Sequence, residues 1–122
     1  MDSQEVFDTI VSHLRQQGCV AQDEFSGMCR YRTDDGKKCA VGVLIPDELY
    51  SPKMESQTYT QLVNNIDTPQ ELVVRLSEHG NLLIRMQEVH DKYTTNQWEF
   101  EFRKVANDFH LQYNLPQQGT KS

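Results

Sequence analysis

The chain has 122 residues, of which 37% are hydrophobic and 25% charged, a composition typical of a globular domain rather than of a disordered or fibrous protein. Its formal net charge of −6 excludes broad electrostatic capture of nucleic acid by the whole surface. No apolar run approaches the ~18 residues that span a bilayer, and the N-terminus, MDSQEVFDTI, lacks the basic and apolar regions of a secretory signal. We therefore expect a cytoplasmic protein that binds neither membrane nor nucleic acid directly.

We expect a single globular domain over residues 1–116, followed by a flexible polar tail at 117–122. Its first element is predicted to be a helix over about residues 3–17. Asp2 or Ser3 can cap the start of this helix, and Gly18 can provide the left-handed residue that ends it. The apolar residues recur on one stripe, as an amphipathic helix requires: Val6, Phe7, Ile10, Val11 and Leu14.

Residues 27–41 have a different pattern. Asp35-Gly36 is a strong turn signal, and before it the residues Cys29 and Tyr31 alternate with Arg30 and Arg32, as in a half-buried strand. The following stretch, KKCAVGVLI, fits either a second strand or a short buried helix, because periodicity cannot separate the two in a short apolar run. We favour the hairpin over the strand–turn–helix, and Pro46 ends either version.

The second half of the chain has helical patterns. A turn or short helix at 46–57 precedes a short helix near 57–65. The TPQE motif at residues 68–71 predicts a capping box, with Thr68 as the cap of a helix that bends or breaks near Gly80. Asn96 with Glu99 predicts a second cap, which opens a last helix. This helix carries a clear apolar stripe, formed by Trp98, Phe102, Val105, Ala106 and Phe109. The predicted fold class is α+β: a predominantly helical single domain with one small β-hairpin packed against four or five helices.

Three cysteines, Cys19, Cys29 and Cys39, are an odd number at a spacing that matches no zinc knuckle, so free thiols are expected. We interpret Cys29 and Cys39 as small buried side chains. The alternative is a thiol- or zinc-dependent small enzyme in which one of them pairs with His90. His79 and His90 lie eleven residues apart, about 16 Å along a helix, which is too far for both to bind one metal. We predict buried structural histidines, no catalytic residue, no metal and no cofactor.

Four basic residues stand close together in an otherwise acidic chain: Arg30, Arg32, Lys37 and Lys38. Two arginines on one strand face could hold a small anion such as a nucleotide through bidentate contacts. A solvent-exposed hairpin, with Asp34 and Asp35 neutralising half of the charge, would explain the same pattern without any ligand.

Phe100 and Leu111 point away from the apolar stripe of the last helix. The simpler interpretation is that both pack under another segment of the chain. Alternatively, they form a surface for a protein partner or for self-association into a homo-oligomer, because exposed aromatic residues commonly anchor interfaces.

The segment MCRYRTDDGKKCAVGVLIPDELY resembles small proteins of tailed phages and bacteria that share a CxYR…GxKCAVGxLIPDExY core. The resemblance is strongest over residues 29–50 and looser over most of the chain. It implies an origin in phages or mobile elements and a role in host takeover or counter-defence. It brings no catalytic residue with it.

The leading hypothesis is therefore a small acidic phage-type accessory protein that binds and inhibits or modulates a host protein in the host cytosol. Its negative charge suits docking onto a basic surface of that protein. The alternatives are a binder of a small anionic ligand at the basic hairpin and the small enzyme described above.

Overall fold

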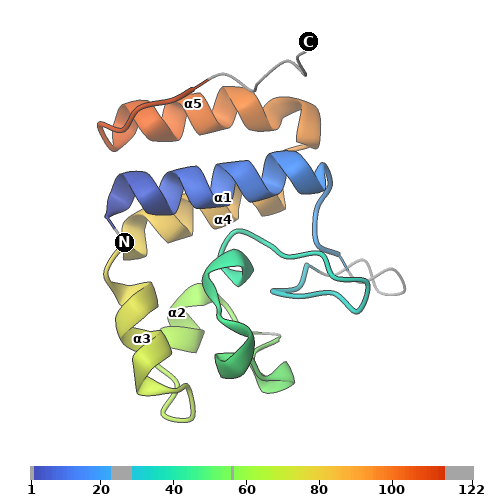
Figure 1. Ribbon diagram of the computed structural model, residues 1–122, viewed down its shortest axis with the longest axis vertical. Coiled ribbons are helices and arrows are strands. Elements are labelled where there is room, and N and C mark those ends of the chain that lie inside the picture. The colour runs from blue at the N-terminus through green and yellow to red at the C-terminus, as the bar shows by residue number, and fades with distance from the viewer. Residues whose placement is uncertain (1, 23–28, 56, 115–122) are drawn as a thin grey trace.

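The computed structural model describes residues 2–22, 29–55 and 57–114 (Figure 1). The predicted tail at 117–122 lies outside these residues. The longer helices are α1 (Ser3–Gln17), α3 (Gln70–Ser77), α4 (Gly80–Lys92) and α5 (Trp98–Asp108). The short elements are α2 (Tyr59–Val63) and the 3-10 turns η1 (Gly42–Leu44), η2 (Asp47–Leu49), η3 (Pro52–Met54) and η4 (Thr95–Gln97). None of these helices is long and apolar enough to cross a membrane.

Helices α1, α4 and α5 form the upper part of the molecule, with the connecting segments and α2 and α3 below them (Figure 1). Helix α5 runs antiparallel to α1 (Figure 1). The end of α1 therefore meets the start of α5, where Arg15 forms a bidentate ion pair with Glu99. At the other end, the Gln4 amide pairs with both the N–H and the C=O of Gln112. These contacts hold residues 111–114 against α1.

The predicted bounds of the first helix are confirmed. Asp2 and Glu5 form a capping box at its start, Gly18 ends it with a φ of 71°, and the five expected apolar residues are buried. The break near Gly80 is also confirmed, since α3 ends at Ser77 and α4 begins at Gly80.

Two predicted caps are wrong. Thr68 does not cap α3; its hydroxyl donates instead to the carbonyl of Leu62. The capping box before α5 is formed by Thr94 with Gln97, not by Asn96.

The β-hairpin is wrong, and with it the α+β class: the described residues contain helices and no strand. Near the expected hairpin they form two isolated bridges, Gln22 with Cys29 and Arg32 with Lys38. The Asp35-Gly36 turn is present, with Gly36 at a φ of 92°. After Cys39 the chain enters turns and then η1, so residues 38–45 are neither an extended strand nor an α-helix.

The physical reason lies in the hydrogen bonds of residues 31 and 32. The N–H groups of Tyr31 and Arg32 donate to the two carboxylate oxygens of Glu55, at 2.9 and 3.1 Å. An acid side chain thus occupies donors that a sheet ladder would use. On the other arm, Gly42 lies so close to Tyr31 that a Cβ atom there would be 2.1 Å from the Tyr31 carbonyl oxygen.

Gly42→Ala should therefore lower the free energy of unfolding by about 3 kcal/mol, because the added methyl group meets backbone rather than a movable side chain. Gly18→Ala is the matched control. Its Cβ would meet nothing within 4 Å, so it should cost only the ~1 kcal/mol of a left-handed alanine. Urea unfolding of the two variants measures the difference, and equal losses would contradict the close approach.

Candidate functional site

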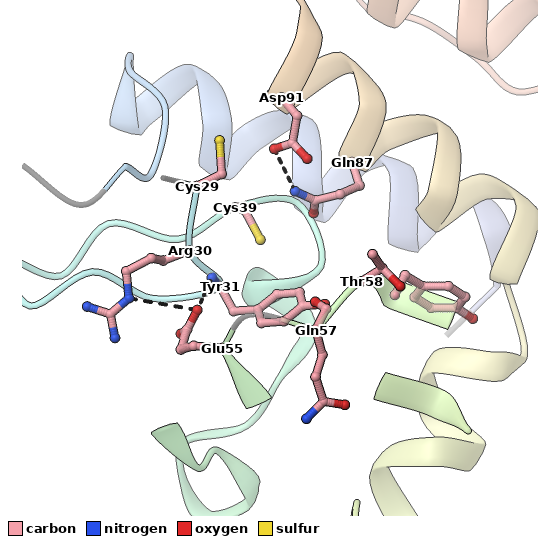
Figure 2. A pocket seen from close by; sticks show the side chains of 10 residues that line it. Cys29, Arg30, Tyr31, Cys39, Glu55, Gln57, Thr58, Gln87 and Asp91 are labelled. Atoms are coloured by element: carbon pink, nitrogen blue, oxygen red, sulfur yellow. Dashed lines mark hydrogen bonds and ion pairs between the residues drawn. The ribbon is translucent and has the colours of Figure 1, made fainter. Parts of the chain in front are cut away.

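A cavity of about 300 Å³ lies between the segment at residues 29–31, the segment that contains Glu55 and residues 57–59, and α4 (Figure 2). These three parts of the chain are far apart in sequence and meet only in the folded protein. The lining residues are Cys29, Arg30, Tyr31, Cys39, Glu55, Gln57, Thr58, Tyr59, Gln87 and Asp91.

His90, next to the cavity, is completely buried and has both ring nitrogens occupied. Its Nε2 atom lies 2.9 Å from the backbone nitrogen of Ala21, and its Nδ1 atom lies 2.7 Å from Oδ1 of Asp91. Because a backbone N–H can only donate, Nε2 is the acceptor, and Nδ1 carries the proton that is donated to Asp91. The ring also stacks on Trp98 at a centroid distance of 6.0 Å. His90 is therefore a positioning residue for Asp91.

Asp91 brings a negative charge to the cavity. Burial raises the pKa of its carboxyl group, but hydrogen bonds from His90, Gln87 and Cys29, together with the electrostatic effect of His90, outweigh burial and leave the pKa below its ordinary value. The carboxylate is thus ionised at neutral pH. Gln87 is itself fixed, since its Oε1 atom accepts the N–H of Val41 at 3.0 Å.

The two cavity thiols are protonated at neutral pH. Cys29 is exposed, yet partial desolvation and the negative charge of Asp91 raise its pKa to about 11. Cys39 is buried, as expected, and burial raises its pKa to about 12. The expectation that Cys29 is also buried is wrong, since its side chain is exposed.

Cys29, His90 and Asp91 bring their donor atoms within 4.8 Å of one another, although we expected their sulfur and imidazole groups to be isolated core filling. The arrangement opposes a thiol nucleophile. A reactive thiol needs a base or positive charge beside it, whereas Cys29 has a carboxylate beside it and the imidazole has no free nitrogen to receive a proton.

The same three residues use the donor types that zinc prefers, but their geometry does not fit a zinc site. Coordination through Nδ1 of His90 would remove its proton while Nε2 still faces the N–H of Ala21, which requires an anionic imidazolate. That leaves Cys29 and Asp91, one ligand fewer than the three protein ligands of a catalytic zinc site. Cys39, named in the zinc alternative, lies outside this group of described residues.

The two predicted anion-binding arginines point to different partners. The Arg30 guanidinium lies 3.8 Å from Glu55 and points toward it, away from Asp91 (Figure 2). Arg32 pairs with Asp47 at 2.8 Å and lies over the ring of Tyr50 at 4.6 Å. Both arginines are thus paired with carboxylates of the chain itself, and of the two only Arg30 lines the cavity.

Of the two predicted lysines, Lys37 is engaged through its side chain and Lys38 through its backbone. The Lys37 ammonium group contacts Asp35 at 2.7 Å, next to the turn. The backbone N–H of Lys38 donates to Oε1 of Gln17, and its carbonyl accepts from the Gln17 amide. Neither lysine lines the cavity.

Phe100 and Leu111 differ in their surroundings. The side chain of Phe100 is 65% exposed, with the Lys104 ammonium group 5.6 Å from its ring centre. Leu111 is partly buried and packs against the hydrophobic core. Only Phe100 is available as part of a surface.

Sequence reasoning missed Asp91, Gln87 and Glu55, which line the cavity. A signal existed for part of this set: Gln87 and Asp91 are four residues apart and so share one face of α4. Glu55 gave no signal, because the two backbone N–H groups that it accepts, those of Tyr31 and Arg32, are more than twenty residues away in the chain.

Comparison of the chain with protein-family models, with curated proteins and with solved structures finds no match. The function of the candidate site is therefore inferred from its geometry alone.

Asp91→Asn should make Cys29 more reactive. The thiolate population at neutral pH rises about tenfold for each unit by which the thiol pKa falls, and the accompanying ~3-fold loss of nucleophilicity leaves a net gain of about threefold per unit. Alkylation by iodoacetamide, followed by peptide mass spectrometry at pH 7, measures this. In the unchanged protein the rate should keep rising with pH toward the Cys29 pKa of about 11.

The matched control is Glu88→Gln, which removes a carboxylate of α4 that does not line the cavity. Its Cys29 rate should equal that of the unchanged protein. An equal rate in Asp91→Asn would show that Asp91 does not control the thiol.

Proposed function

We propose that this protein binds a small organic molecule in the cavity between residues 29–31, Glu55 with residues 57–59, and α4. The observation that supports this most is a carboxylate, Asp91, held at the cavity wall by hydrogen bonds from two side chains, His90 and Gln87. A fixed charge beside a concave, partly aromatic surface is typical of ligand sites, where a few polar groups orient a mostly apolar contact.

The two tyrosines of the cavity contribute ring surface rather than hydroxyl groups. The Tyr31 hydroxyl donates to the carbonyl of Gln57 at 2.5 Å, and the Tyr59 hydroxyl donates to the carbonyl of Leu76 at 2.7 Å. With both hydroxyls engaged, the rings and the Cys39 thiol favour an apolar part of a ligand.

The volume of about 300 Å³ is at the lower end of the range for ligand pockets. It suits a molecule of roughly 10–15 non-hydrogen atoms. The predicted nucleotide is larger than this, and its phosphates would face the charge of Asp91. A small molecule that avoids a negative group near α4 fits better.

Nuclear magnetic resonance titration with a panel of small polar metabolites tests the proposal. We expect at least one member to shift the backbone amide signals of residues 29–31, 57–59 and 87–91 in a saturable way. Cys29→Phe should abolish these shifts, because the larger side chain at an exposed lining position occupies the cavity.

Lys92→Phe is the matched control, since it adds the same ring to α4 at an exposed position outside the cavity lining. Binding should survive in this variant. If no panel member gives saturable shifts at millimolar concentration, the cavity is not a ligand site.

A second proposal is that the protein is an acidic phage-type accessory protein that binds and modulates a host protein. The supporting observation is the 65% exposure of Phe100 on α5, opposite the buried stripe of that helix. The resemblance to phage proteins expected from residues 29–50 would make a host protein the partner class, and the net charge of −6 favours a basic surface on it.

Phe100→Asp should remove a partner that the unchanged protein captures from host lysate. Ile66→Asp is the matched control, because it places the same charge at another apolar side chain, which is 97% exposed. Leu111→Asp is unsuitable, since Leu111 packs against the core and its replacement would destabilise the fold. Equal capture by all three proteins would contradict a role for Phe100.

A further inference from the structure

The charges that line the cavity are not balanced. Glu55 accepts the N–H groups of Tyr31 and Arg32 and the hydroxyl of Tyr50, so its carboxylate is engaged by the fold. Arg30, the cationic residue of the described lining, lies at 3.8 Å from that same carboxylate and points away from α4. The charge of Asp91 thus has no cationic side chain opposite it in the described lining.

The field of Asp91 extends across the cavity. Its negative charge contributes to raising the pKa of three other lining groups, after the larger effect of desolvation: the Cys29 thiol, the Cys39 thiol and, behind the effects of Cys39 and Glu55, the Tyr31 phenol. These groups come from both sides of the turn at residues 34–36. An anion placed among them would meet the same unfavourable potential, whereas a cation would be stabilised.

We infer that the ligand of this cavity is a small organic cation: a protonated amine on an apolar body, with its ammonium group on Asp91. The inference rests on the proposed ligand-binding function and adds the chemical class. The ammonium group would donate to the carboxylate that His90 and Gln87 hold in place. The apolar body would contact the ring of Tyr31 or Tyr59, and an aromatic face next to an ammonium group adds cation–π attraction.

The groups around Asp91 favour a protonated amine over a zinc ion and over an anion. A zinc ion would need a third protein ligand, which His90 cannot provide while its Nε2 atom accepts the N–H of Ala21. A phosphate or carboxylate would need a free cationic partner, and Arg30 already lies beside Glu55. A primary amine needs only the ionised carboxylate and an apolar wall.

Three matched probes of nearly equal shape test the inference: benzylamine, benzyl alcohol and benzoate, titrated separately into the full chain by nuclear magnetic resonance. A ligand this small is expected to bind at about 1–20 mM. We expect benzylamine to shift the amide signals of residues 29–31 and 87–91, with an affinity at least tenfold above that of benzyl alcohol. Benzoate should give no saturable shift.

Asp91→Asn should reduce benzylamine affinity at least tenfold, since the Asn oxygen can still accept from His90 and Gln87 but carries no charge. Glu88→Gln removes a carboxylate of the same helix outside the lining and should leave the affinity unchanged. An unchanged amide spectrum outside the cavity confirms that each variant is folded. Zinc chloride, titrated in parallel, should give no saturable shift at residues 29 and 90–91.

The outcomes separate this inference from the proposed function. Equal affinities for the amine and the alcohol, a preference for benzoate, or an unchanged benzylamine affinity in Asp91→Asn would overturn the cation and leave a ligand-binding cavity. Saturable zinc binding would overturn it in favour of a metal. No saturable benzylamine shift at about 20 mM would also overturn it, and the metabolite panel would then decide on the cavity itself.

Discussion

The backbone N–H groups of residues 19–22 and 29–41 need hydrogen-bond acceptors, and side chains provide many of them in place of a β-ladder. Leaving one such group buried and unpaired would cost about 1–3 kcal/mol, so these acceptors determine how the segment lies on the helices. They are His90 for Ala21, Glu55 for Tyr31 and Arg32, Thr33 for Lys37, Gln17 for Lys38, and Gln87 for Val41.

Two of these acceptors, Gln87 and His90, also hold Asp91 in place at the cavity, which couples the fold to the candidate site. Gln87 accepts the N–H of Val41 with its oxygen and donates to Asp91 with its nitrogen. His90 likewise accepts the N–H of Ala21 with Nε2 and donates to Asp91 with Nδ1. The N–H of Ala21 thus determines which ring nitrogen carries the proton. The position of Asp91 is thus a consequence of how the irregular segment satisfies its own backbone.

Local signals in the sequence predicted the local structure well, and long-range contacts decided the rest. The stripe of α1 and its Gly18 cap needed only neighbouring residues, so the helix was predicted with its correct bounds. The break at Gly80 and the turn at Gly36 were predicted for the same reason. The prediction of a hairpin was wrong because the alternation in residues 29–32 does not reveal the role of Glu55. This carboxylate lies 24 and 23 residues after Tyr31 and Arg32 and accepts their backbone N–H groups. The cavity likewise depends on contacts between segments that are distant in sequence: residues 29–31, Glu55 with residues 57–59, and α4. No periodic pattern encodes these contacts.

The order in which Cys29, Asp91 and His90 lie at the cavity determines the reactivity of the thiol. In a thiol nucleophile the imidazole lies next to the sulfur, so that a positive charge can form there and lower the thiol pKa. Here the carboxylate of Asp91 lies next to Cys29, and His90 lies behind it with no free nitrogen. In this order the same residue types raise the pKa of the thiol instead of lowering it, so that Cys29 keeps its proton and Asp91 keeps its charge. A fixed negative charge beside neutral thiols and aromatic rings favours binding of a positive group over covalent chemistry at sulfur.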